Sequence, residues 1–207
     1  AQFAKSVDVV SFEFENVPLE TMNVIGRYVP LRPSANVLHV VQDRIREKTF
    51  LAEAGFPVAR FHAIGSLDEL QAALPTCNPG VLKTAAWGYD GKGQARIDSA
   101  ENAAAAWKQM DTDAAVLEAF IDFELELSVV AARGSNGHVA CYDPIVNRHR
   151  NHILDVSVSP GGLPQDVASQ AIEIARAVLA ELEVVGVLCV EFFLTRDGEL
   201  LINELAP

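Results

Sequence analysis

A glycine-rich segment between two short apolar stretches is the feature that most constrains the fold of this chain. Residues 88–94 read GYDGKGQ, with three glycines among six residues and a lysine between them. Glycine lets the backbone approach an anion closely, so this composition is typical of a loop that surrounds phosphate groups. A Walker loop or a dinucleotide-binding turn leads from a strand into a helix. Residues 80–83 and 94–97 both read as strands instead, so the sequence predicts a glycine-rich flap between two antiparallel strands.

The charge of the chain limits the ligands that it can bind. Half of its 207 residues are hydrophobic, which is enough to bury the core of one or two domains. The net charge of −12 argues against a nucleic-acid partner, because phosphate backbones are bound by basic surfaces. If the ligand is a smaller anion, its cations must be local, and the candidates are Arg44, Lys48, Lys83 and Lys92.

Targeting signals and cysteine spacing point to a cytoplasmic protein. The apolar runs are too short to cross a bilayer, and no signal-peptide pattern opens the chain, so we expect no membrane partner. Cys77, Cys141 and Cys189 are scattered without metal-ligand spacing, and we interpret them as buried thiols in a reducing compartment. The sequence starts without methionine and stops directly after a predicted strand. We therefore expect both ends to be cuts within a longer protein.

Hydrophobic periodicity predicts helices and strands in two parts. Residues 7–14 and 29–32 read as strands around a helix that Asn16 caps, and we interpret residues 1–36 as the tail of an α/β domain. After Ser34 we expect helices at 44–54, 67–74, 100–110 and 165–182. The predicted strands are 61–64, the hairpin at 81–97, 115–120, 124–133, 138–146, 187–194 and 200–205. Residues 37–207 would thus form an α+β domain.

The last predicted hairpin sets two glutamates opposite each other. If residues 197–198 form a two-residue turn, counting back along both strands pairs Glu191 with Glu204. Facing carboxylates between apolar strands repel unless a cation lies between them. Mg²⁺ held by these carboxylates and by substrate phosphates would resolve the repulsion, with Asn203 as a neighbouring neutral oxygen. The alternative is an edge strand or a longer turn, which would leave both carboxylates in water.

Other polar residues allow two readings each. Glu118 and Glu126 could contact a nucleotide base and ribose, or could be solvated charges at strand ends. Arg44 lies near a helix start, where the helix dipole does not favour a cation, which hints at a ligand but also fits a surface arginine. His149 falls in the polar stretch 147–152, either a surface loop or the basic rim of a phosphate site. Because we find no Ser-His-Asp or Cys-His set, the sequence disfavours covalent hydrolase chemistry.

These segments together resemble the ATP-grasp family, and within it the 5-(carboxyamino)imidazole ribonucleotide synthases of purine biosynthesis. The resemblance to the superfamily rests on the order of Lys83, the 88–94 loop, Glu118–Ile121, Glu126, and Glu191 with Asn203 and Glu204. The resemblance to the synthases rests on residues 12–18 (FEFENVP), 42–44 (QDR), 88–94 and 202–207 (INELAP). It covers nearly the whole chain and implies an α+β ATP-grasp fold, in which two lobes hold ATP between them.

The resemblance also implies a role for each matching residue. Arg44 and Lys83 would contact the ATP phosphates as the catalytic cations, under a loop formed by Gly88, Tyr89, Asp90, Gly91, Lys92, Gly93 and Gln94. The adenine would lie against Glu118, Ala119, Phe120 and Ile121, the ribose against Glu126, and His149 would be near the nucleotide. Glu191 and Glu204 would bind Mg²⁺ beside Asn203, and Tyr89, Lys92 and more weakly Glu13 would face the second substrate.

The implied reaction is the ATP- and bicarbonate-dependent carboxylation of 5-aminoimidazole ribonucleotide, through carboxyphosphate, by a homodimer. We expect the family's N-terminal glycine-rich turn and its C-terminal substrate-binding segment to lie outside this sequence. Val146 stands where relatives often carry a polar residue. Two alternatives remain open, namely another ATP-grasp ligase that joins a carboxylate to an amine, and a nucleotide-binding fragment without catalysis.

Overall fold

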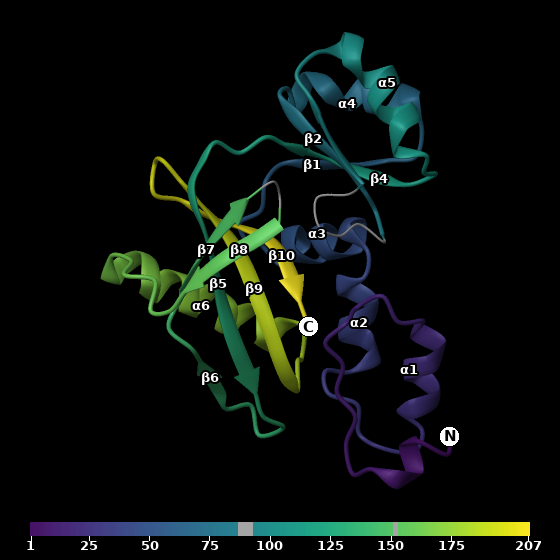
Figure 1. The fold of residues 1–207 in the computed structure, drawn as a ribbon, viewed down its shortest axis with the longest axis vertical. Coiled ribbons are helices and arrows are strands. Elements are labelled where there is room, and N and C mark those ends of the chain that lie inside the picture. Colours follow the sequence, from purple (N-terminus) through teal and green to yellow (C-terminus); the bar gives the residue numbers. More distant parts are fainter. Residues whose placement is uncertain (87–92, 151–152) are drawn as a thin grey trace.

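The structure is a computed structural model of the chain, and it describes residues 1–86, 93–150 and 153–207. These residues form a small upper lobe, a larger lower lobe and an N-terminal helical segment (Figure 1). Both sheets are antiparallel and both lobes contain helices, so the predicted α+β class is confirmed. Within the described ranges, no helix has the length and apolar character needed to cross a membrane.

The small lobe is a four-stranded sheet covered by two helices. Its strands follow the order β1-β4-β2-β3, with β1 at Phe61–Ile64, β2 at Gly80–Thr84, β3 at Gln94–Ile97 and β4 at Ala115–Ala119. The helices are α4 (Leu67–Ala73), followed by a short 3₁₀ turn η2 (Leu74–Thr76), and α5 (Ala100–Met110). Leu70, Leu82 and Leu117 are fully buried in its core. The predicted glycine-rich hairpin is confirmed, because β2 pairs antiparallel with β3 and Lys83 faces Gln94.

The larger lobe is a six-stranded sheet with one long helix on its face (Figure 1). The strand order is β10-β9-β5-β7-β8, and β6 pairs with β5. The strands are β5 (Phe123–Arg133), β6 (Val139–Cys141), β7 (Ile145–Arg150), β8 (Ile153–Val158), β9 (Gly186–Thr195) and β10 (Leu200–Ala206). The amphipathic helix α6 (Gln165–Glu181) buries Ala171, Ala175 and Val178 against the sheet, as its helical spacing predicts.

One predicted hairpin differs from the structure at its second strand. Residues 138–146 read as one strand, but the structure divides them between β6 and β7. Pro144 lies at the break, where it has no N–H to donate to a sheet ladder. Strand β7 then continues to Arg150, so the prediction that His149 lies in a loop was wrong. Arg148, His149 and Arg150 are all exposed, which hides the alternation that would have indicated a strand.

The N-terminal segment is helical rather than sheet-like. It contains a 3₁₀ turn η1 (Ala4–Ser6), α1 (Leu19–Ile25) and α2 (Ala35–Val41), and α3 (Arg44–Glu53) follows it between the two lobes (Figure 1). The strands predicted at 7–14 and 29–32 were wrong, because there only Val10 and Leu31 form an isolated bridge. The prediction that Asn16 caps the helix was also wrong, since α1 begins after Pro18 without a side-chain cap. The Gln42 side-chain amide instead donates to the carbonyls of Glu15 and Val17.

Candidate functional site

The site is built around helix α3, which lies between the lobes. The Asp43 side chain caps this helix by accepting a hydrogen bond from Arg46 N–H, which fixes where the helix begins. Arg44, Glu47 and Lys48 follow at i, i+3 and i+4 spacing and therefore share one face of α3. This face contacts residues 202–205 of β10. The Arg44 backbone N–H also donates to the Ala85 carbonyl, just beyond β2, at 2.8 Å.

Glu191 and Glu204 are paired across β9 and β10, as predicted, but the turn length and the strand register differ from the prediction. Leu200 pairs with Leu194 and Ile202 with Phe192, so the turn is longer than two residues and the register is offset by one. A β-bulge between Ile202 and Glu204 removes the offset and sets Glu204 opposite Glu191. The two-residue turn was therefore a wrong prediction, while the carboxylate pair that it was used to derive is confirmed.

Electrostatics give the two carboxylates different protonation behaviour. Burial, together with the charges of Glu204 and Glu126, raises the pKa of Glu191 to about 7. Burial acts in the same direction on Glu204, but Arg44, which donates from Nη1 to Glu204 Oε2 at 2.8 Å, outweighs it and lowers that pKa. One carboxylate is thus held ionised while the other titrates near neutrality. Such a pair gains from a cation placed between its members.

The residues at this pair fit a hard divalent cation. Asn203 lies in the bulge beside Glu204, and its buried Oδ1 has no hydrogen-bond partner within the described ranges. Carboxylate and amide oxygens are the ligands that Mg²⁺ prefers. The described part of the chain contains no group of three or more acidic, histidine or cysteine ligands placed to hold a metal. Oxygens from a substrate would therefore complete the coordination, as is usual for Mg²⁺ in phosphate chemistry.

Two lysines, one buried and one partly exposed, share one carboxylate on the small-lobe side of the site. Lys83 Nζ lies 3.1 Å from Glu118 Oε1, and Lys48 Nζ lies 3.5 Å from Glu118 Oε2. Burial alone would raise the pKa of Glu118, but Lys83 and Lys48 outweigh it and lower that pKa. Burial lowers the pKa of Lys83, against the opposing effect of Glu118. Lys83 retains some solvent exposure, whereas Lys48 has none, so only Lys83 is open to a ligand.

The glycine-rich loop is described only at its end. Gly88, Tyr89, Asp90, Gly91 and Lys92 lie outside the described residues, so their predicted contacts remain predictions.

Gly93 and Gln94, in contrast, lie at the start of β3, next to Lys83 of the paired strand. Gly93 has φ +71°, and a Cβ added there would meet Thr84 Oγ1 at 2.6 Å. This position requires glycine, and the Thr84 N–H bond to the Gly93 carbonyl closes the hairpin.

The segment expected to hold a base connects the two lobes. Ala119 N–H donates to the Arg60 carbonyl and Phe120 N–H to the Pro79 carbonyl, while Ile121 follows in the link to β5. The Arg96 guanidinium stacks over the Phe120 ring, 4.0 Å from its centroid. In the larger lobe, the Glu126 carboxylate on β5 contacts Nδ1 of the His149 ring on β7. The structure thus brings the predicted ribose and nucleotide residues together on adjacent strands.

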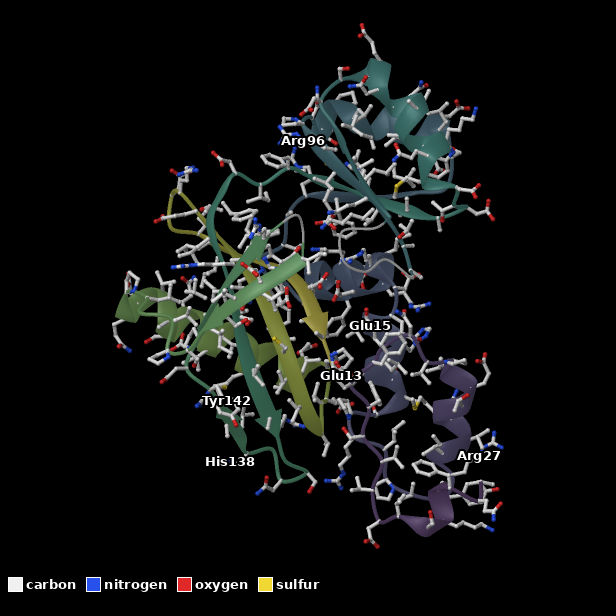
Figure 2. The ribbon with its side chains drawn as sticks, in the orientation of Figure 1. Glu13, Glu15, Arg27, Arg96, His138 and Tyr142 are labelled. Atoms are coloured by element: carbon white, nitrogen blue, oxygen red, sulfur yellow. The ribbon has the colours of Figure 1, made fainter. Side chains whose placement is uncertain are left out.

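A pocket opens beside the carboxylate pair, between the N-terminal segment and the end of β10. Its volume is about 250 Å³. Glu13 and Glu15 line it from one side, and Arg44, Glu47 and Glu204 line it from the other. Figure 2 shows Glu13 and Glu15 on the N-terminal segment, near the C-terminal end of the chain. Glu13, which the resemblance assigned to the surface facing the second substrate, therefore lines the same pocket as Glu204.

The sequence analysis did not identify Glu47 as a site residue, and it assigned Lys48 the wrong partner. Glu47 is buried and accepts a hydrogen bond from Leu205 N–H at 2.6 Å, and burial raises its pKa to about 8. Lys48 was proposed only as one of several cations for an anion, but its ammonium donates to the Asn203 carbonyl at 2.6 Å. Their spacing from Arg44 was a usable signal for a shared helix face, although the sequence did not reveal what that face contacts.

Comparison with known proteins gives two matching family models. The ATP-grasp domain model matches residues 49–207, and the ribonucleotide synthetase preATP-grasp domain model matches residues 1–42. An N5-carboxyaminoimidazole ribonucleotide synthase from Brucella melitensis is 39% identical over 210 residues, which cover 100% of this chain and 58% of that protein.

Solved structures of proteins with the same name superimpose closely on the chain. The crystal structure of an ADP complex of N5-carboxyaminoimidazole ribonucleotide synthetase matches with a TM-score of 0.93 at 36% identity, covering 100% of this chain and 55% of that one. The Aspergillus clavatus carboxyaminoimidazole ribonucleotide synthase complexed with ATP has a TM-score of 0.92 at 25% identity, covering 99% and 55%. This chain therefore spans about half the length of these proteins.

Proposed function

This chain belongs to the ATP-grasp family, and we propose that it is the nucleotide-binding part of an enzyme that carboxylates 5-aminoimidazole ribonucleotide with ATP and bicarbonate. The product would be 5-(carboxyamino)imidazole ribonucleotide. The observation that carries the proposal is the pairing of Glu191 with Glu204 beside Arg44, with Lys83 in the same inter-lobe region. The identity to N5-carboxyaminoimidazole ribonucleotide synthases over the full chain supports this substrate class.

We assign the nucleotide to the space between the lobes. Arg44 and Lys83 would bind its phosphates beneath the 88–94 loop, and residues 118–121 would hold the adenine. Because the Glu118 carboxylate already lies between two lysines, we assign the adenine contact to the backbone of this segment. Glu126, with His149 beside it, would bind the ribose hydroxyls. Residues 1–36 would be the end of a preATP-grasp domain, and 37–207 the ATP-grasp domain.

We assign Mg²⁺ to Glu191, Glu204 and Asn203, which would hold it, and when bound it would supply positive charge that offsets the charge developing during phosphoryl transfer. The chain's own residues then act mainly by position and charge. Bicarbonate would attack the γ-phosphate to give carboxyphosphate and ADP, while Arg44 and Lys83 stabilise the added negative charge as fixed cations. The exocyclic amine of the ribonucleotide would then attack the carboxyl carbon, either of carboxyphosphate or of CO₂ released from it. The C–O bond to phosphate breaks, inorganic phosphate leaves, and the amine loses a proton as the N–C bond forms.

The pocket beside Glu204 would receive the ribonucleotide, with Glu13 on its wall. By the family resemblance, Tyr89 and Lys92 would also contact this substrate. We further propose a cytoplasmic homodimer, on the basis of the family resemblance. Two other functions stay open, namely a related ligase that uses formate or an amino acid as its carboxylate, and a nucleotide-binding fragment without catalysis.

The test is ADP release by the purified protein after its intact mass has been measured. We expect ADP only when ATP, Mg²⁺, bicarbonate and 5-aminoimidazole ribonucleotide are all present. ADP release with formate or an amino acid in place of bicarbonate would favour the related ligase. ATP binding without ADP formation, with every substrate supplied, would favour the non-catalytic fragment.

A further inference from the structure

We propose that Lys48 is a positioning residue that couples metal binding at Glu204 to phosphate binding at Lys83, without touching either ligand. The inference rests on the proposed function, which places Mg²⁺ at Glu204 and nucleotide phosphates at Lys83. Lys48 lies on α3, whereas Glu204 lies on β10 of the larger lobe and Lys83 on β2 of the small lobe. Its ammonium contacts groups from both lobes.

The ammonium of Lys48 is enclosed by groups of the protein itself. An ammonium group carries three N–H donors. Lys48 Nζ donates to the Asn203 carbonyl at 2.6 Å and to the Ile202 carbonyl at 3.4 Å, and it lies 3.5 Å from Glu118 Oε2. Its side chain is 0% exposed. The structure therefore assigns Lys48 to the support of other groups, in contrast to the partly exposed Lys83.

On the β10 side, Lys48 holds the backbone of the bulge that orients Glu204. A bulge disrupts the regular ladder of a sheet and leaves its extra residue unpaired. The carbonyls that Lys48 contacts belong to Ile202 and Asn203, directly before Glu204. On the other side of Glu204, Leu205 N–H donates to Glu47. Two adjacent residues of α3, Glu47 and Lys48, thus fix the backbone on both sides of the proposed metal ligand.

On the β4 side, Lys48 shares the Glu118 carboxylate with Lys83 and so reduces the neutralisation of the Lys83 charge by Glu118. Glu118 is 2% exposed, and a buried carboxylate without partners would take up a proton. With Lys48 and Lys83 beside it, Glu118 stays ionised and keeps the Lys83 ammonium in place. Since one carboxylate serves two ammonium groups, the trio keeps a net positive charge that favours a phosphate at Lys83.

One cation therefore influences both ligands by separate routes. Without Lys48, the bulge carbonyls would lose their donor and Glu204 would be less well oriented for Mg²⁺. Without Lys48, Glu118 would also pair with Lys83 alone and neutralise it, which would weaken phosphate binding. The effect on Glu204 can be measured only when Mg²⁺ is present. The effect on Lys83 can be measured without Mg²⁺.

The test compares ADP affinity with and without Mg²⁺, by calorimetry, in the complete protein that contains this chain. Lys48→Met keeps the length of the side chain and removes its charge. We expect ADP binding without Mg²⁺ to weaken about tenfold, and the gain in ADP affinity on adding Mg²⁺ to fall about threefold or more. Lys108→Met removes a lysine from the exposed face of α5 and should leave both values unchanged.

Glu118→Gln separates the two routes. It removes the negative charge between the two ammonium groups, so it should not weaken ADP binding without Mg²⁺ as Lys48→Met does, and it should leave the gain from Mg²⁺ at the parent value, because the bulge contacts remain. In the Glu118→Gln background, Lys48→Met should have a smaller effect on Mg²⁺-free ADP binding than it has in the parent. If Lys48→Met does not fold, Lys48→Gln is measured in its place, and an unchanged Mg²⁺-free ADP affinity together with an unchanged gain from Mg²⁺ in that variant overturns the proposal.

Two other results also overturn it. A folded Lys48→Met protein whose ADP affinity and Mg²⁺ gain both match the parent excludes a positioning role. A lower melting temperature or a smaller active fraction with unchanged dissociation constants shows a purely structural role. If the parent protein itself binds no ADP with Mg²⁺, the proposed function fails first, and the inference falls with it.

Discussion

Glu191 lies directly opposite Glu204, although the strands that carry them are out of register by one residue nearer the turn. The bulge at Asn203 restores the pairing and leaves the Asn203 Oδ1 buried without a hydrogen-bond partner in the described structure. Two acidic residues and an asparagine therefore lie next to one another on two strands whose other paired residues are apolar. Of these two carboxylates, Glu204 is the one that accepts a hydrogen bond from the Arg44 guanidinium, so the pair is electrostatically asymmetric.

Replacing Glu204 with glutamine should abolish Mg²⁺-dependent ATP use. The change keeps the size of the side chain but removes the charge that a metal and Arg44 both need. We expect ADP formation to fall by about 100-fold or more, as for the loss of a group that stabilises the transition state. ADP release under saturating substrates is the measurement, and Glu199→Gln in the exposed turn is the control. Full activity of Glu204→Gln would exclude the metal assignment.

Arg44→Met tests the fixed cation beside this carboxylate. Arg44 forms a 2.8 Å ion pair with Glu204, and that carboxylate raises the pKa of the guanidinium against the effect of burial. Its removal should lower kcat/KM for ATP by about 100-fold, because the charge cannot be replaced by water in the same position. Arg46→Met alters an exposed arginine on the same helix and should have little effect. Equal losses in both variants would contradict a specific role for Arg44.

Much of the fold could be predicted because its signals are local. Helix α3 follows a capping aspartate, and α6 repeats apolar residues at helical spacing, so their bounds agree with the structure to within one residue. The N-terminal strands could not be predicted correctly, because alternation in residues 7–14 does not reveal whether a partner strand exists. Strand β7 was missed beyond Val146 because most of its remaining side chains are exposed and polar.

The site was predictable as a set of residue types, but not as a network. Glu204, Lys83 and the glycine-rich loop stand out by composition and order in the sequence. The partners of Lys48 are separated from it by 154 and 155 residues, and those of Glu47 by 158. No local pattern encodes such contacts. What the sequence does contain is the i, i+3, i+4 spacing of Arg44, Glu47 and Lys48, which places them on one face.

Gly93→Ala should destabilise the small lobe and weaken nucleotide binding. Gly93 has φ +71°, and a Cβ would meet Thr84 Oγ1 at 2.6 Å, so the strand next to Lys83 would have to shift. We expect a loss of about 1–3 kcal/mol in the free energy of unfolding, measured in urea. Gly198→Ala is the matched control, since Gly198 also has a positive φ but nothing within 4 Å of its added Cβ. If both variants lose the same stability, the contact with Thr84 has no energetic consequence.

The stability of the protein should fall as the pH rises toward 8, and Glu47 should contribute to this fall. Burial is the largest cause that raises the pKa of Glu47 from 4.5 to about 8, although Lys48 opposes it. Between these two values the folded state binds more protons than the unfolded state, so the free energy of unfolding decreases with increasing pH. Below pH 4.5 both states are protonated, and the contribution of Glu47 is constant.

Glu47→Gln should flatten this decline while keeping an oxygen that can accept from Leu205 N–H. Some slope should remain, because burial also raises the pKa of Glu191 to about 7. The measurement is the free energy of unfolding in urea at several pH values from about 5 to about 8. Glu53→Gln, at an exposed position on the same helix, should follow the parent curve. A curve for Glu47→Gln that runs parallel to the parent would show that Glu47 ionises in the folded state as easily as in water.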